Sequence, residues 1–326
     1  MQAITAVVRR IVYGILLLLA VIVFNFILIH LAPGDPAETI AGEMGGATEE
    51  IIQQIRVAYG LDKSLPEQLL NYLGHIVQGD LGSSFYFNSP VSELILERLP
   101  ATLLLVFAAM ILAVVTGTVL GVVASRNPHG LFSNAVTLVA LVGYAAPAFW
   151  LGLMALILFA STMPIFPISG MQSIGLDLGP FGQAVDVLHH LVLPAVTLAI
   201  IFVAIYSRLA RASMLEVLGS DYIRTARAKG LNERTVIYKH ALRNALLPVV
   251  TIAGIQFGQA FAGAVLVETV FNWPGMGQLA FESILRRDHP TMLGILFFSA
   301  LVVIIANVLT DIFYRIIDPR IRASND

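Results

Sequence analysis

Long apolar stretches separated by polar segments dominate the pattern along this chain of 326 residues. Each stretch is about twenty residues long, the length at which a helix crosses the roughly 30 Å hydrocarbon core of a bilayer. A helix also satisfies its own backbone hydrogen bonds there. We therefore predict an all-α membrane protein with six transmembrane helices, at 11–31, 100–123, 132–160, 187–207, 246–267 and 291–313. Pro147 and Pro194 lie within two spans and are expected to kink them.

The polar segment 32–98 after the first span has helical periodicity of its own. Thr48 can cap a helix that Gly60 ends, because glycine readily adopts the left-handed conformation at a helix C-terminus. Pro66 can open a second helix, which Gly79 ends. The segment is therefore predicted to be a small helical extracytoplasmic segment of two short amphipathic helices.

Composition agrees with a membrane protein and removes several kinds of site. Hydrophobic residues make up 57% of the chain and charged residues only 12%, about half the usual charged fraction of a soluble domain. There is no cysteine, which excludes disulfides and thiolate metal sites. The histidines show no metal-ligand spacing, and nothing points to nucleic acid. We expect no metal and no cofactor in this chain.

The basic residues predict the orientation of the chain in the membrane. With a cytoplasmic N-terminus, 14 of the 19 Lys and Arg residues fall in cytoplasmic segments, eight of them in the loop after the fourth span. Basic residues are concentrated on the cytoplasmic side of membrane proteins. Both termini are therefore predicted to be cytoplasmic, in a multi-pass protein surrounded by membrane lipid.

The predicted organisation follows from these segments. The N-terminus and first span (1–31) precede the extracytoplasmic segment (32–98), a five-span core (99–314) and a cytoplasmic tail (315–326). The core includes a cytoplasmic loop at 208–245 and a turn-rich outer segment at 268–290.

The loop 208–245 contains the clearest helix signals outside the spans. Asp221 can cap a short helix, Tyr222–Lys229, which Gly230 ends. Tyr222, Ala226 and Lys229 are expected to share one face. Such a helix fits a contact with another protein, although its basic residues could also serve only as the topology signal of a helix on the membrane surface.

Several motifs then resemble one family of membrane proteins. DYIRTARAKGL (221–231) followed by HALRNALLPVVT (240–251) is similar to the cytoplasmic loop of ABC-importer permeases of the peptide/nickel family. The same order of motifs runs through the chain: LAPGDP (31–36), GLDK (60–63), GDLGSSF (79–85), FNWPGMG (271–277), RRDHP (286–290) and DPRIR (318–322). The chain resembles the first of the two paralogous permeases of such a system.

This resemblance implies the ABC-importer permease fold and a set of partners. They are a paralogous permease subunit, two ATPase subunits that bind ATP and Mg, and an extracytoplasmic solute-binding protein, in a bacterial cytoplasmic (inner) membrane. The chain itself has no G-x-x-x-x-G-K-[ST] motif for nucleotide phosphates. It is therefore expected to be a transport subunit and not an enzyme. The solute is left open among dipeptides, oligopeptides, glutathione and nickel.

The resemblance also assigns a coupling role to the short cytoplasmic helix, which would dock on an ATPase subunit. Arg224 stands where the family's motif is named for a glutamate, so the chemistry of this contact would differ. The implied coupling residues are Asp221, Tyr222, Arg224, Thr225, Ala226, Arg227, Lys229 and Gly230.

Two further sets of residues are candidates for the transport path. Polar side chains deep in spans are costly and face the protein interior or a water-filled route; we expect pathway lining, or else interhelical hydrogen bonds, from Asn25, Tyr144, Gln256, Gln259 and Asn307. The outer segment is predicted to act as an outer gate or a contact for the binding protein, or else only as a hairpin with Trp273 at the membrane interface. Its candidate residues are Glu268, Asn272, Trp273, Pro274, Arg287 and Asp288.

Two other functions would require features that can be sought in the spans. An ion-driven transporter would be expected to place carboxylates in mid-span, and an intramembrane enzyme would need a catalytic constellation within the spans. The spans contain neither pattern.

Overall fold

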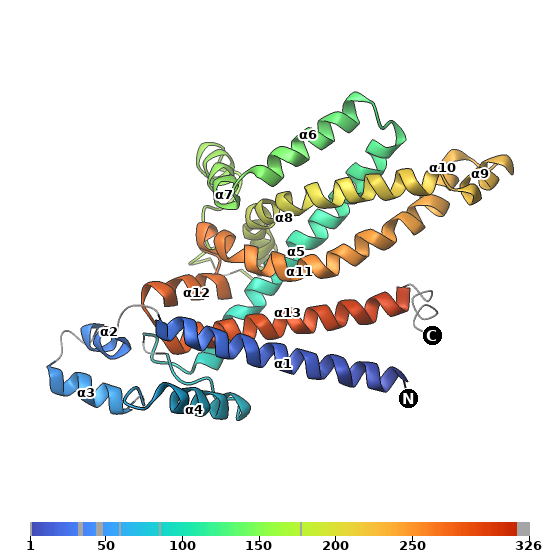
Figure 1. The fold of residues 1–326 in the computed structure, drawn as a ribbon. Coiled ribbons are helices and arrows are strands. Elements are labelled where there is room, and N and C mark those ends of the chain that lie inside the picture. Colours follow the sequence, from blue (N-terminus) through green and yellow to red (C-terminus); the bar gives the residue numbers. More distant parts are fainter. Residues whose placement is uncertain are drawn as a thin grey trace. The chain divides into compact units, whose positions relative to one another are not determined.

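The structure is a computed structural model that describes residues 2–31, 35–43, 48–58, 60–84, 86–176 and 178–317. The chain divides into two compact units, each of which is described by itself. Unit 1 comprises Met1–Ala101 and Gly275–Ile305, and unit 2 comprises Thr102–Pro274 and Ala306–Asp326. Helices account for nearly all the regular structure of the described part (Figure 1).

Unit 1 contains the predicted first span and the described residues of segment 32–98. Its helices are α1 (Gln2–Leu31), α2 (Pro36–Glu43), α3 (Glu49–Ala58), α4 (Leu65–Val77), the start of α5 (Val91–Arg126), α12 (Met276–Leu285) and most of α13 (His289–Ile317). The two predicted amphipathic helices are present as α3 and α4, whereas α2 was not predicted. Phe26 of α1 and Leu293 of α13 are buried together, with Leu69 and Tyr72 of α4 packed against them. The core of this unit therefore joins α4 to the two spans.

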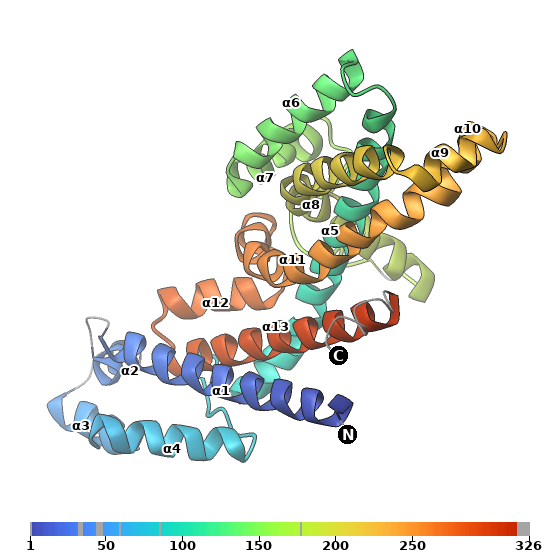
Figure 2. The ribbon, with the colours of Figure 1, turned by 45° about the vertical axis from the view of Figure 1, so that its right-hand side comes forward.

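Unit 2 contains the middle spans and the cytoplasmic loop. After the rest of α5 come α6 (Leu131–Ala145), α7 (Ala148–Leu156), the π-helix η1 (Ile157–Thr162), α8 (Pro180–Leu218), α9 (Asp221–Ala228), α10 (Glu233–Thr235), the π-helix η2 (Val236–Ala241) and α11 (Leu242–Phe271). Helix α8 packs against both α6 and α11, and both views show it between them (Figures 1 and 2). It is the central helix of the unit.

Two glycines let α5 and α8 approach closely. A Cβ atom added to Gly117 would lie 2.6 Å from Cβ of Tyr206, and one added to Gly121 would lie 2.5 Å from the backbone oxygen of Ser207. Real Cβ atoms do not approach other atoms this closely. The G-x-x-x-G spacing in the second span is therefore a packing site between helices.

The prolines of the predicted spans behave differently from one another. Helix α8 continues through Pro194 without a break. The predicted span 132–160 is broken at Ala146 and Pro147, and its two halves, Leu131–Ala145 and Ala148–Thr162, meet at 103°. One continuous kinked helix was therefore the wrong expectation at this position. Proline lacks the backbone N–H, and Ala146 before it is extended, as sterics favour at such a position.

The membrane-spanning character of the helices matches the prediction in part. Four runs, Val91–Arg126, Pro180–Leu218, Glu233–Phe271 and His289–Thr310, are long and apolar enough to cross a bilayer, and the bent pair can form a fifth. In α1 the apolar stretch found among the described residues is shorter than such a span and covers Val12–Leu28. The all-α membrane fold is confirmed, while the count of six spans stays a prediction.

Candidate functional site

Helix α9 sits on a small apolar cluster of unit 2. Ile223 is fully buried and Ala226 is 8% exposed, and both pack with Met214 of α8 and with Val236 and Ile237 of η2. The cluster holds α9 against the C-terminal end of α8. One face of this short helix is therefore buried within the chain, and the opposite face is exposed.

The exposed face of α9 carries most of the predicted coupling residues. Asp221, Tyr222, Arg224, Thr225, Arg227, Lys229 and Gly230 are all exposed. Ala226, predicted on the same face as Tyr222 and Lys229, differs from these two exposed residues because it is buried in the cluster beneath the helix.

The ends of α9 are set by backbone conformation and by local contacts. Ser220, and not Asp221, occupies the extended position before the helix, while Asp221 lies in the first turn, where a carboxylate is favourable. Gly230 has a φ of +77° and ends the helix as predicted.

Two side-chain contacts join this helix to other parts of the loop, and a third lies within the helix. Arg227 Nη2 donates to Glu233 Oε1 at 2.8 Å, and Asn244 Nδ2 donates to Tyr222 Oη at 2.7 Å. Arg224 Nη1 lies 3.3 Å from Asp221 Oδ1. The helix thus presents its charges on a fixed surface.

The predicted outer-gate residues are divided between buried and exposed positions. In unit 2, Glu268 and Trp273 are fully buried, and Thr102 Oγ1 donates to Glu268 Oε1 at 2.7 Å. The alternative of Trp273 as an anchor at the membrane interface does not fit this burial, and its role in an outer gate stays a prediction. Asn272 is exposed and takes the left-handed conformation at the end of α11, and Pro274 is half-buried.

The two remaining gate candidates lie in unit 1, at the turn between α12 and α13. Asp288 is 1% exposed and accepts hydrogen bonds from the hydroxyls of Ser84 and Thr291. Arg287 beside it is exposed, with a φ of +53°. Asp288 therefore fastens a loop to a helix start, and Arg287 is the one of the two that a partner can reach.

The structure places the predicted pathway residues on four helices and brings none of them together by a hydrogen bond within the described ranges. In unit 1, Asn25 of α1 is half-buried. In unit 2, Gln256 of α11 is 9% exposed, whereas Gln259 of α11 and Asn307 of α13 are exposed. Tyr144 of α6 is exposed, and the Arg208 guanidinium lies 5.9 Å from its ring centroid. Their role as pathway lining stays a prediction.

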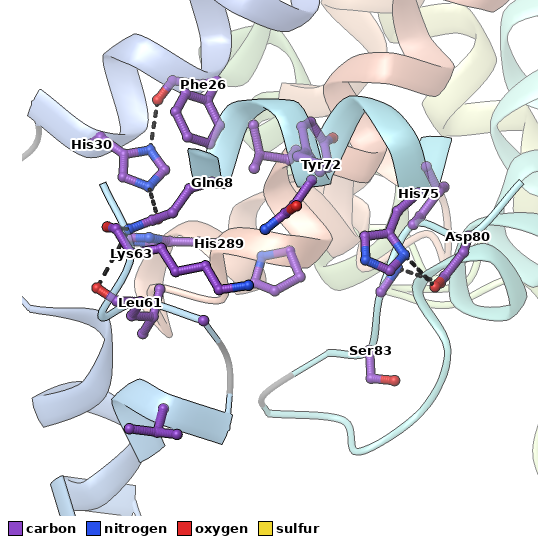
Figure 3. A pocket seen from close by; sticks show the side chains of 17 residues that line it. Phe26, His30, Leu61, Lys63, Gln68, Tyr72, His75, Asp80, Ser83 and His289 are labelled. Carbon is purple, nitrogen blue, oxygen red and sulfur yellow. Dashed lines mark hydrogen bonds and ion pairs between the residues drawn. The ribbon is translucent and has the colours of Figure 1, made fainter. Parts of the chain in front are cut away.

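Unit 1 contains a pocket that the sequence analysis does not predict. It has a volume of about 540 Å³ and lies among the outer end of α1, helix α4, the segment after α4 and the start of α13 (Figure 3). Its polar lining includes Lys63, His75, Asp80 and His289. These residues belong to no single motif, although Lys63 lies in GLDK, Asp80 in GDLGSSF and His289 in RRDHP.

Comparisons with known proteins agree with this architecture. The family model described as "Binding-protein-dependent transport system inner membrane component" matches residues 117–323, and the model of its N-terminal part matches residues 3–106. Together these two models span most of the chain.

Relatives are similar over nearly their whole length. The chain is 39% identical to the oligopeptide transport system permease protein AppB of Bacillus subtilis and 40% identical to the dipeptide transport system permease protein DppB of Escherichia coli, covering 97% of this chain and 98% of each relative. A solved structure of the MetNI methionine ABC transporter, in an inward-facing conformation, matches with a TM-score of 0.56 at 17% identity. That match covers 70% of this chain and 97% of the other and shows a shared fold.

Proposed function

Because this chain belongs to the family of binding-protein-dependent transport system inner membrane components, it is a membrane permease subunit, and we propose that its importer carries di- or oligopeptides. Two relatives of nearly equal length are named for oligopeptide and dipeptide transport, which supports this class of solute. Membership of the family implies an ATPase and a binding protein as partners. In our proposal the chain forms half of the translocation pathway, beside a paralogous permease and above two ATPase subunits.

The observation that carries the coupling part of the proposal is the two-sided packing of α9. Its inner face is fixed by Ile223 and Ala226, and its outer face offers Asp221, Arg224 and Thr225 to a partner. A rigidly seated helix can transmit a movement of its partner to α8 and α11, because the cluster beneath it is close-packed. We propose that this outer face docks on an ATPase subunit, and that both termini lie on the same, cytoplasmic side.

The coupling proposal is tested by reversing one charge on the exposed face. We expect Arg224→Glu to abolish the stimulation of ATP hydrolysis by the peptide-loaded binding protein. In our proposal the ATPase surface that meets Arg224 is acidic, so a glutamate at this position would be repelled by it. ATP hydrolysis is measured in the reconstituted transporter with and without loaded binding protein.

Arg234→Glu is the matched control, since Arg234 is an exposed arginine of the same loop outside α9. It should leave the stimulation intact. Equal stimulation in both variants and in the unchanged protein would contradict the coupling proposal.

The solute proposal is tested by uptake. Proteoliposomes that contain the complete transporter and its binding protein should accumulate a labelled dipeptide. ATP is supplied on the side of the membrane where the ATPase subunits lie. Accumulation of nickel but of no peptide would contradict the assignment of the solute.

The outer surface is proposed to receive the binding protein. Segment 32–98 carries ten acidic and three basic residues, and Glu49 and Glu50 of α3 are exposed. An acidic surface attracts a partner with a complementary basic rim and makes association sensitive to salt. Of the proposed gate residues, Asn272 and Arg287 are the ones exposed for a direct contact.

A further inference from the structure

The pocket of unit 1 has opposite charges at its two ends. Lys63, in the turn before α4, extends along the pocket toward His289, while Asp80, after α4, lies at the other end beside His75 (Figure 3). Helix α4 separates Lys63 from Asp80 in the sequence and runs along one side of the pocket. The length of this helix therefore sets the spacing of the two charges.

Both charged groups keep capacity for a ligand. In the described part of the chain, no carboxylate lies within 4.0 Å of the Lys63 ammonium, which can donate three hydrogen bonds. Asp80 Oδ2 lies 3.1 Å from His75 Nδ1, and Asp80 Oδ1 accepts from the backbone N–H of Gly82 at 2.8 Å. A carboxylate has about four acceptor positions, so about two remain open on Asp80, whose side chain is 57% exposed.

The wall between the two charges is largely apolar. Phe26, Leu81, Pro290 and Leu293 contribute to it, and Asn71 adds an amide. The volume of about 540 Å³ falls within the range of roughly 300–1,000 Å³ typical of small-molecule sites. No group of three or more His, Asp and Glu residues is arranged to hold a metal ion in the described ranges, so the three histidines of this pocket do not form a metal site.

We propose that this pocket binds a short zwitterionic peptide, with the peptide carboxylate on Lys63 and the peptide ammonium on Asp80. An apolar side chain of the peptide would lie against the wall formed by Phe26 and Leu293. A ligand that is only anionic would meet the Asp80 carboxylate, and one that is only cationic would meet Lys63, so a ligand with both charges fits best. The inference rests on the proposed function, because peptides are its solute class. It adds a second binding site, lined by none of the residues predicted for the pathway.

The test uses the complete transporter in lipid nanodiscs without its binding protein, titrated by calorimetry. The probes are leucyl-leucine, leucyl-leucinamide without the free carboxylate, and N-acetyl-leucyl-leucine without the ammonium. We expect Lys63→Met to weaken the binding of leucyl-leucine about tenfold, because a charge-assisted hydrogen bond is lost. The binding of leucyl-leucinamide should not weaken, because this ligand has no carboxylate for Lys63 to bind, and its retained binding also shows that the variant is folded.

Asp80→Asn should give the complementary pattern, with weaker binding of leucyl-leucine and no loss of binding of N-acetyl-leucyl-leucine. Asparagine keeps the acceptor for the Gly82 N–H but loses the charge. Asp62→Asn and Lys239→Met are matched controls, because both residues are exposed and neither lines the pocket. They should bind leucyl-leucine as the unchanged protein does.

The pocket and the proposed function can fail separately. No binding of leucyl-leucine to the unchanged transporter, or equal binding to all variants, would overturn the inference about the pocket. Uptake of labelled leucyl-leucine by the same transporter supplied with its binding protein would then still support the proposed function. The absence of uptake for every peptide tested would instead contradict the solute class.

Discussion

A buried carboxylate in unit 2 depends on a single neighbouring residue for one of its hydrogen bonds. Glu268 is fully buried at the outer end of α11, and Thr102 of α5 donates to it. Removing one partner of a buried polar group leaves the other without its hydrogen bond, which costs more than the bond contributes. Thr118, also on α5, is 9% exposed, but its hydroxyl has no hydrogen-bond partner among the described residues.

The two threonines therefore form a matched pair for mutation. We expect Thr102→Val to lower the free energy of unfolding by about 1–3 kcal/mol, because it removes a donor from a buried carboxylate. Thr118→Val removes a hydroxyl that pairs with nothing and should be neutral or slightly stabilising. Thermal unfolding in detergent measures both, and equal losses in the two variants would argue against the role given to Thr102.

Among the elements, the outer helices α2 and α3 are joined by an ion pair. The Asp35 carboxylate precedes α2 and accepts hydrogen bonds from Arg56 Nε of α3 at 3.1 Å and from the Ala37 N–H at 2.8 Å. Partial burial by itself would raise the pKa of Asp35, but the hydrogen bonds from Arg56 and Ala37 lower it below its ordinary value. The ionised form is thus the one that holds the two helices together.

This pKa predicts how the outer helices respond to acid. A lowered pKa means that the contact is fully present above the ordinary Asp value of about 3.9 and is lost as the pH falls through the lower, folded value. We expect the protection of the α2 and α3 amides from hydrogen exchange, taken relative to the intrinsic rate at the same pH, to fall below about pH 4, and Asp35→Asn to show this lower protection already at pH 7. Asp62→Asn, in the following turn, should keep the behaviour of the unchanged chain. Slow exchange in Asp35→Asn at pH 7 would show that this ion pair does not hold the helices.

At the scale of the whole molecule, the apolar spans are only partly covered by the chain itself. In the most apolar window of α8, 56% of the residues are buried, but in that of α13 only 17% are. Leu138, Val139, Leu141 and Val142 of α6 are also exposed. These faces require lipid or another membrane subunit, because apolar surfaces of this extent are not left in water.

We therefore predict the subunit composition of the purified importer. Tagged chain, extracted with its native partners, should contain one copy of this permease and one copy of a homologous permease. Native mass spectrometry gives the copy numbers directly. A complex with two copies of this chain and no paralogue would contradict the proposed heterodimer.

The sequence by itself determined the features that depend on neighbours along the chain. The lengths of the apolar stretches predicted the long helices, glycine predicted the end of α9 at Gly230, and the order of motifs predicted the family. Such features are local, since span length, helix termination and turn preference act over a few residues or one helix. This is also why α3 and α4 were predicted without any knowledge of their packing.

Only the tertiary structure decided which side of each element is covered. Ala226 was expected at a surface and is buried, because it packs in a cluster with Val122 of α5 and Met214 of α8. Trp273, the alternative membrane-interface residue, is also fully buried. The pocket with Lys63 and Asp80 at its ends could not be predicted either, since it needs α1, α4 and the start of α13 to meet. Burial and the convergence of charges arise from contacts between distant segments, and periodicity along one segment carries no information about them.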